Sequence, residues 1–122
     1  MFCQRPYAYS DAVALCTSMQ MHLVRIDDAA ENDWLTAIAF PTGLEPPIWI
    51  GADDLATAGE FFWPDGTQLW TGGATGHPVG GAYTNWQNGA PKAIGNCVDL
   101  GGSSFWFVTK CQSGLRALCE SN

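Results

Sequence analysis

The chain has 122 residues, which is enough for one domain with its own hydrophobic core. Its formal net charge is −7 and it has only five Lys and Arg residues, too few for a basic surface, so we expect neither nucleic acid nor an anionic membrane as a partner. No stretch is long and apolar enough for membrane insertion, and five cysteines in so short a chain favour an oxidising compartment, so we expect a secreted, extracellular or periplasmic protein.

The first twenty residues have neither the positively charged nor the apolar region of an export signal. We therefore expect that a signal was removed ahead of residue 1. The sequence also lacks an Asn-x-Ser/Thr sequon, which favours a bacterial or otherwise unglycosylated source.

A first helix is predicted near the N-terminus, where Ser10 or Asp11 can act as its cap. Apolar residues then recur at helical spacing, which is typical of a helix with one buried face. These residues are Ala12, Val13, Leu15, Cys16 and Met19.

A second helix is predicted after a short extended piece at residues 23–26. Asp28 and Glu31 have the spacing of a capping box, and three apolar residues follow at helical positions. We place one of them, Trp34, on the core-facing side of this helix. Pro41 ends the helix.

Beyond Pro47 the helical period disappears, and short strands separated by Gly-rich turns are predicted at 48–51, 61–63, 96–100, 104–108 and 116–120. The predicted class is α+β, with two helices packed on short antiparallel sheets in a single domain over residues 1–122. Residues from about 70 to 96 form a long loop region without clear periodicity. A loop of that length inside a compact domain is usually functional.

Several motifs follow one another in a definite order along the chain. They are LVRIDDAAEN at 23–32, Trp-Ile-Gly at 49–51, FFWPDG at 61–66, Tyr-Thr-Asn-Trp at 83–86, Gly-Ala-Pro at 89–91, NCVDL at 96–100 and Leu-Cys-Glu at 118–120. Their order and spacing resemble the C-type lectin-like domain of the C-type lectin superfamily over essentially the whole chain. The resemblance implies the C-type lectin-like fold, stapled by disulfides.

The resemblance also implies how four of the cysteines pair. In this family the first helix is bridged to the last strand and a second bridge closes the penultimate strand region, which here means Cys16 with Cys119 and Cys97 with Cys111. Cys3 is left over. Its partner lies in a segment outside this sequence, or it is a buried free thiol, or it forms an intermolecular bridge.

Sugar-binding members of the family hold calcium through oxygens of a Glu-Pro-Asn or Gln-Pro-Asp triplet and a Trp-Asn-Asp triplet. In this chain the corresponding triplets are Ala90-Pro91-Lys92 and Trp106-Phe107-Val108. Calcium needs six to eight oxygen ligands, which these side chains do not supply, so we expect no calcium there.

An auxiliary calcium site found in some relatives would use Asp28, Glu31 and Glu120. The simpler interpretation is that Asp28 and Glu31 cap the second helix.

The altered loop and strand form the candidate ligand-binding surface. Strand alternation puts Phe105 and Phe107 on one face and Trp106 on the other. The alternative for these residues is ordinary core and surface filling. The candidate ligand-binding residues are Gln87, Asn88, Lys92, Asn96, Phe105 and Phe107.

We predict a non-enzymatic recognition module that binds a protein ligand without calcium at the usual lectin site, because apolar replacements suit a protein interface. One alternative is a lectin that binds carbohydrate without a metal, and another is a structural or adhesive spacer domain of a larger secreted protein. No catalytic residue is predicted, because His22 and His77 have no nucleophile in a recognisable local arrangement.

Overall fold

The computed structural model describes residues 2–121, with the side chains from Arg5 onward. Two α-helices, one short 3₁₀ helix and nine strands make up this part of the chain, which confirms the α+β prediction. The helices are α1 (Tyr9–Ser18), α2 (Ala29–Ala39) and η1 (Gly73–Thr75). The strands are β1 (Phe2–Tyr7), β2 (Met21–Leu23), β3 (Ile48–Asp53), β4 (Phe61–Phe62), β5 (Gln68–Thr71), β6 (His77–Pro78), β7 (Cys97–Leu100), β8 (Trp106–Thr109) and β9 (Leu115–Ser121).

The sheet is mixed, with mostly antiparallel pairs as predicted and one parallel pair of strands. Its strand order is β1-β9-β3-β4-β5-β6, with β2 paired to β9 and β7 placed between β3 and β8. The exception to antiparallel pairing is β3 with β9, which run parallel. Strand β9 thus pairs antiparallel with β1 and β2 and parallel with β3.

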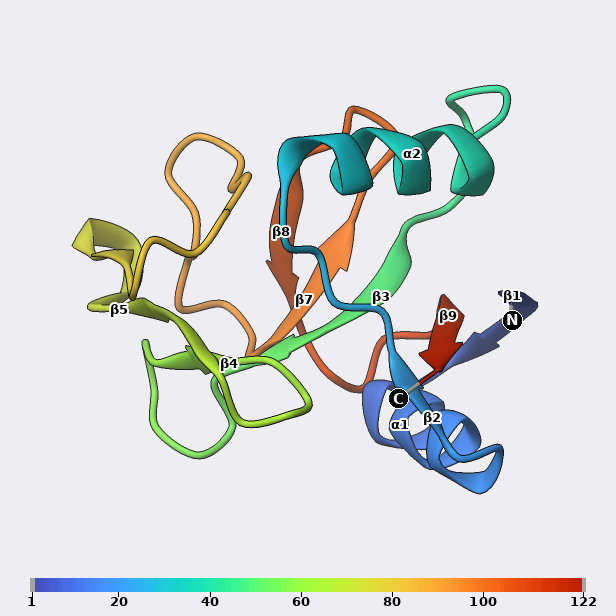
Figure 1. Cartoon of the computed structure of the whole chain (residues 1–122), viewed down its shortest axis with the longest axis horizontal. Coiled ribbons are helices and arrows are strands. Elements are labelled where there is room, and N and C mark those ends of the chain that lie inside the picture. The colour runs from blue at the N-terminus through green and yellow to red at the C-terminus, as the bar shows by residue number, and fades with distance from the viewer. Residues whose placement is uncertain (1, 122) are drawn as a thin grey trace.

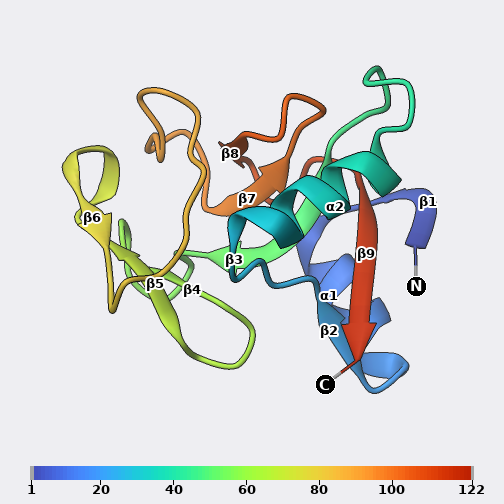
Figure 2. The ribbon, with the colours of Figure 1, turned by 45° about the horizontal axis from the view of Figure 1, so that its top comes forward.

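Two regions separate in space around the long strand β3 (Figure 1). At one end lie α1, β1, β2 and β9, together with both ends of the chain. At the other end lie the hairpins of β4 and β5 and the loop that leads to β7, while α2 covers β7 and β8. Figure 2 shows β9 running beside β2 and β1 on the terminal side of the molecule.

Helix α1 begins at Tyr9, with Ala8 at the cap position and no side-chain cap bond, so the prediction of a Ser10 or Asp11 cap is wrong. Tertiary contacts fix this end instead. The Tyr9 backbone N–H donates to the carbonyl of Cys111 at 2.8 Å, and its hydroxyl donates to Asp53 Oδ2 at 2.8 Å. Burial raises the pKa of the Tyr9 phenol above its ordinary value, with a further contribution from the Asp53 charge.

Helix α2 has the predicted cap. Asp28 Oδ1 accepts a hydrogen bond from the Glu31 backbone N–H at 2.8 Å, and Glu31 Oε1 accepts one from the Asp27 N–H at 2.8 Å. The core-facing position of Trp34, however, is wrong, because its side chain is 62% exposed. The buried residues of the helix are Asn32, Leu35 and Ala39.

Asn32 faces the core because it has partners there. Its Oδ1 accepts a bond from the buried Trp106 Nε1–H at 2.8 Å, and its Nδ2–H donates to the Ser104 carbonyl at 3.0 Å. Residues two positions apart lie on nearly opposite sides of an α-helix, so burying Asn32 turns Trp34 to solvent.

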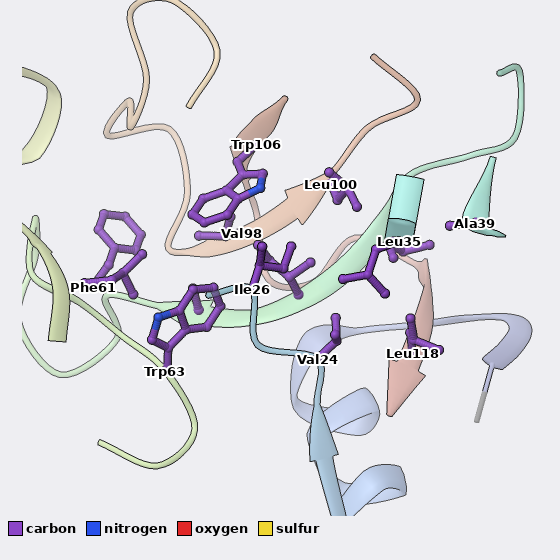
Figure 3. Close-up of a cluster of buried hydrophobic side chains, with 14 of the residues drawn as sticks. Val24, Ile26, Leu35, Ala39, Phe61, Trp63, Val98, Leu100, Trp106 and Leu118 are labelled. Carbon is purple, nitrogen blue, oxygen red and sulfur yellow. The ribbon is translucent and has the colours of Figure 1, made fainter. Parts of the chain in front are cut away.

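The main core lies between α2 and the sheet and combines aliphatic side chains with large rings. Figure 3 shows the rings of Trp63 and Trp106 beside Val98 and Ile26, with Leu35 reaching down from α2. A second cluster includes Tyr9, Leu23 and Trp49 and surrounds the Cys16–Cys119 bridge. Trp49 and Trp63 are both buried.

Candidate functional site

Two disulfides hold the framework of the candidate site, and both pairings implied by the resemblance are present. Cys16 is bonded to Cys119 and Cys97 to Cys111, with Cα–Cα distances of 5.5 and 5.3 Å. The backbone of Cys3 pairs with Ala117 in the β1–β9 ladder. The Cys3 side chain lies outside the described residues, so its partner stays open.

Strand β8 orients the aromatic residues of the predicted surface. Trp106 and Val108 are buried, while Phe107 between them is half-buried on the other face. Phe105 precedes the strand, in the turn after β7, and is 42% exposed. Val108, which the resemblance places opposite a calcium ligand of sugar-binding members, therefore belongs to the interior, whereas Phe107 reaches the surface.

A hollow of about 240 Å³ lies beside Phe107, and we call it the β8 hollow. It brings together four of the six predicted ligand-binding residues. Its lining consists of Gln87, Asn88, Ala90, Lys92, Ile94, Phe107 and Val108. Phe105 and Asn96 do not line it.

The loop that rims the β8 hollow is tied to β8 by its backbone. The Gln87 N–H donates to the Trp106 carbonyl at 3.0 Å, and the Trp106 N–H donates to the Asn85 carbonyl at 2.9 Å. The Ala90 N–H then donates to the Gln87 carbonyl at 2.8 Å, ahead of the cis Ala90–Pro91 peptide bond. These bonds hold residues 85–91 over the strand.

Aromatic packing anchors the same loop from below. The Trp86 ring makes edge contacts with Phe61, Trp70 and Trp106, at centroid distances of 5.3, 5.9 and 5.6 Å. The segment predicted as a loop also contains η1 and β6, which pairs with β5. Residues 70–96 are thus an ordered platform rather than a structureless loop.

Asn96 serves the framework. Its Nδ2–H donates to Asp54 Oδ1 at 3.0 Å, and its carbonyl accepts from the Asp54 N–H at 3.0 Å. The paired bonds join the loop after β3 to the start of β7. Asn96 lines a second hollow on this side of the loop, lined also by Lys92 and Ile94.

A buried carboxylate lies behind Phe107. Asp99, opposite Phe107 in the β7–β8 ladder, is 3% exposed and accepts a hydrogen bond from the Thr109 hydroxyl at 2.5 Å. Burial raises the pKa of Asp99 to about 6, and the Thr109 bond opposes that rise. Folding therefore favours the protonated form of this carboxyl group.

The side chains at the family's principal calcium position do not fit the ion. Ala90 and Phe107 provide no oxygen and Lys92 brings a positive charge, whereas calcium takes six to eight oxygen ligands. Among the side chains that the structure describes, from Arg5 to Ser121, no group of three His, Cys, Asp or Glu residues is arranged to hold a metal.

The side chains of the proposed auxiliary calcium site are engaged by protein donors. Asp28 and Glu31 each accept a backbone hydrogen bond at the start of α2. Glu120 Oε1 accepts from the Arg25 N–H at 2.9 Å and lies 3.0 Å from His22 Nε2. Burial, together with the charges of nearby carboxylates that include Glu120, raises the pKa of Glu31.

Comparison with known proteins settles the family. Residues 5–121 match the model of the Lectin C-type domain. The chain belongs to the C-type lectin family. It is therefore a binding module of that family, and no helix among residues 2–121 has the length and apolarity needed to cross a membrane.

Similar proteins include parts of large receptors. The chain is 36% identical over 109 residues to the mouse low affinity immunoglobulin epsilon Fc receptor, covering 86% of this chain and 28% of the receptor. It is 28% identical over 117 residues to rat C-type mannose receptor 2, covering 95% of this chain and 7% of that protein. The chain thus spans less than a third of the length of either relative.

A solved structure supports the same assignment. The cow C-type carbohydrate-recognition domain of CD23, determined in the presence of a GlcNAc2Man3 oligosaccharide, is 30% identical and superposes with a TM-score of 0.77. The match covers 97% of this chain and 82% of that one. The C-type lectin-like fold predicted from the motifs is thereby confirmed.

One residue of the β8 hollow, Ile94, was not predicted from the sequence. Ile94 is 63% exposed and lines the hollow beside Lys92. The available signal was an isolated apolar residue in a polar, Gly-rich loop, and such residues are common on protein surfaces. Its place next to Phe107 needed the three-dimensional structure.

Proposed function

We propose that this chain is a non-enzymatic, extracellular recognition module that binds a protein ligand through the β8 hollow without calcium. The observation that carries the proposal is the lining of the hollow. Phe107 and Ile94 contribute apolar side chains to it, and Gln87 and Asn88 contribute amides and Lys92 an ammonium group. Apolar side chains, aromatic ones above all, combined with polar groups are typical of protein interfaces.

The relatives support a binding role, but their names point to both protein and glycan ligands, so the ligand class is argued from the side chains of the hollow. One is named as a receptor for the Fc part of immunoglobulin epsilon, and another structure was determined with an oligosaccharide. Sugar hydroxyls need hydrogen-bonding partners in number, whereas Phe107 offers an apolar ring where sugar-binding members have a calcium ligand. The replacement favours protein over glycan. The two disulfides favour an extracytoplasmic location.

The proposal is tested with a pair of matched variants. Phe107→Asp places a charge in the hollow, and Phe105→Asp places the same charge two residues earlier, outside it. The immobilised chain is incubated with proteins secreted by its source, and bound proteins are quantified with and without EDTA. We expect at least one protein whose retention falls more than tenfold with Phe107→Asp, is unchanged with Phe105→Asp and is insensitive to EDTA.

A glycan array run in parallel separates the alternatives. EDTA-insensitive sugar binding that Phe107→Asp abolishes would favour a metal-independent lectin. EDTA-sensitive sugar binding would contradict the loss of calcium at this site. Retention of every captured protein by Phe107→Asp would contradict the β8 hollow as the binding surface.

A further inference from the structure

A second and larger hollow, of about 470 Å³, adjoins the β8 hollow. We call it the lysine hollow, because both lysines of the chain, Lys92 and Lys110, line it. Leu55 and Ile94 contribute apolar side chains that are 59% and 63% exposed. Lys92 and Ile94 line both hollows, so the two form one continuous surface.

Close backbone packing brings the two lysines to one place. A Cβ atom on Gly95 would lie 2.4 Å from the Thr109 carbonyl carbon and 2.7 Å from the Lys110 nitrogen, so only glycine lets these segments approach so closely. The Cys97–Cys111 disulfide closes the same junction on the next residues. The lysine hollow is therefore built into the framework.

The lining of the lysine hollow also includes a carboxylate, Asp54, that already accepts hydrogen bonds from other parts of the chain. Asp54 is 6% exposed, and its two oxygens accept hydrogen bonds from the Gly59 N–H at 2.8 Å and the Asn96 Nδ2–H at 3.0 Å. These bonds hold the loop after β3 against the start of β7. The carboxylate is thus occupied by neutral donors rather than by either lysine.

Two of the arginines interact with residues outside the lysine hollow. Arg25 forms ion pairs with Asp27 and Asp65, and the buried Arg116 donates to the Pro46 carbonyl. No ion pair to Lys92 or Lys110 occurs in the part of the chain that the structure describes. On a chain with a net charge of −7, two cations without an acidic partner among the described residues thus lie at one hollow.

We propose that the lysine hollow binds an acidic segment of the protein ligand. Carboxylates of that segment lie beside Lys92 and Lys110, and an adjacent apolar side chain packs on Leu55 and Ile94. Charge complementarity selects the acid, and the exposed aliphatic side chains select a peptide over a hydroxyl-rich acidic sugar. The inference relies on the proposed function for the protein nature of the ligand, and it adds the ligand's charge and a second contact surface.

The test uses a defined peptide on the intact, oxidised chain. The probe is an N-acetylated, C-amidated hexapeptide that alternates Leu and Asp, and its control has Asn in place of Asp. Backbone amide chemical shifts are followed during titration. We expect saturable shifts at residues 92–96 and 110–112 with the Asp peptide, and at least tenfold weaker binding of the Asn peptide. Raising the salt from about 0.1 to 1 M, which shortens the screening length from about 10 to 3 Å, should weaken binding.

Charge reversal assigns the effect to the hollow. Lys110→Glu should weaken binding of the Asp peptide at least tenfold, and Lys110→Gln should have a smaller effect in the same direction. Arg5→Glu is the matched control, because it makes the same charge change at an exposed position outside the hollow. The amide spectrum of each variant reports whether the fold is kept.

The outcomes separate this inference from the proposed function. Lys110 lines the lysine hollow and not the β8 hollow, so loss of hexapeptide binding by Lys110→Glu concerns this inference alone. Equal loss with Arg5→Glu, unchanged binding by Lys110→Glu, or equal binding of the Asn peptide would overturn the acidic-peptide site. Tighter binding of an oligogalacturonate at the same amides would also overturn it, in favour of an acidic glycan. The proposed function of the β8 hollow would still be tested separately, by the effect of Phe107→Asp on retention of the captured protein.

Discussion

The terminal region and the loop region of this domain are stabilised in different ways. In the terminal region, β9 pairs with β1, β2 and β3, and Cys16–Cys119 joins two segments 103 residues apart. In the loop region, residues 85–96 make few regular strand pairs and are held by single backbone bonds, edge-to-face ring contacts and Cys97–Cys111.

This difference in stabilisation indicates which residues can be substituted without loss of the fold. Strand pairing in the terminal region depends on the backbone of every residue in the ladder, whereas the loop region is anchored at a few points that include Trp86 and Asn96. Residues between those anchors, such as Lys92 and Ile94, carry no described framework bond and line the hollows instead. We therefore expect substitutions at these positions to leave the fold intact.

The largest expected effect comes from opening the terminal region. Cys16→Ala with Cys119→Ala removes a bridge that closes a sequence separation of 103 residues. A loop of about 100 residues is expected to contribute about 4.7 kcal/mol through the entropy of the unfolded chain. We expect the free energy of unfolding in urea to fall by about 4–5 kcal/mol. A loss below about 1 kcal/mol would show that strand pairing alone holds the chain ends.

Removing the disulfide of the loop region should lower the free energy of unfolding by less than removing the terminal disulfide, and it should weaken ligand binding more. Cys97→Ala with Cys111→Ala removes a bridge with a separation of 14 residues, for which about 3 kcal/mol is expected. Urea unfolding measures this loss beside that of the terminal bridge. Because the bridge closes the junction under Lys92 and Lys110, hexapeptide binding should also weaken. A variant that keeps full peptide affinity would contradict the view that this bridge shapes the lysine hollow.

A third comparison concerns two faces of α2. Asn32→Ala leaves the buried Trp106 Nε1–H without its acceptor and should lower the free energy of unfolding by about 2–3 kcal/mol. Trp34→Ala removes an exposed ring and should change it by less than about 0.5 kcal/mol. Thermal or urea unfolding of the two variants checks the difference. A larger loss of unfolding free energy with Trp34→Ala than with Asn32→Ala would contradict the exposed position of Trp34.

Sequence reasoning located the features that rest on local chemistry or on a family pattern. The Asp28 cap follows from residue spacing, and the two disulfides follow from the resemblance. The strand β1 was missed because Phe2–Tyr7 has no clear alternation and contains Pro6, and it becomes a strand by pairing with β9.

The misplaced Trp34 and the unforeseen lysine hollow have a common physical cause. Hydrophobic periodicity counts Trp as apolar and Asn as polar, but the partner that buries Asn32 lies 74 positions away at Trp106. The lysine hollow likewise joins loops near residues 55, 74, 94 and 110. Neither arrangement leaves a local signal in the sequence.

The smallest expected effect sharpens the comparison within the loop region, where Asp99 is buried behind Phe107. Its pKa of about 6 in the folded chain exceeds the ordinary value of 3.8, so folding favours the protonated form. This contribution to stability is fully present below about pH 4 and is lost as the pH rises through about 6. Asp99→Asn stays neutral and can still accept the Thr109 bond, so we expect it to exceed the wild type by up to about 2 kcal/mol at pH 7.5 and to match it near pH 3.5.

Thr109→Val provides the opposing control, because the Thr109 hydroxyl bond lowers the pKa of Asp99. Without that bond the folded-state pKa should rise further, so the loss of stability should begin at the same pH as in the wild type but extend to a higher pH. Urea unfolding between pH 3.5 and 8 measures both curves. If the pH dependence survives in Asp99→Asn, the titrating group lies elsewhere, and the loop region owes its acid response to its surface rather than to the strand pair beneath Phe107.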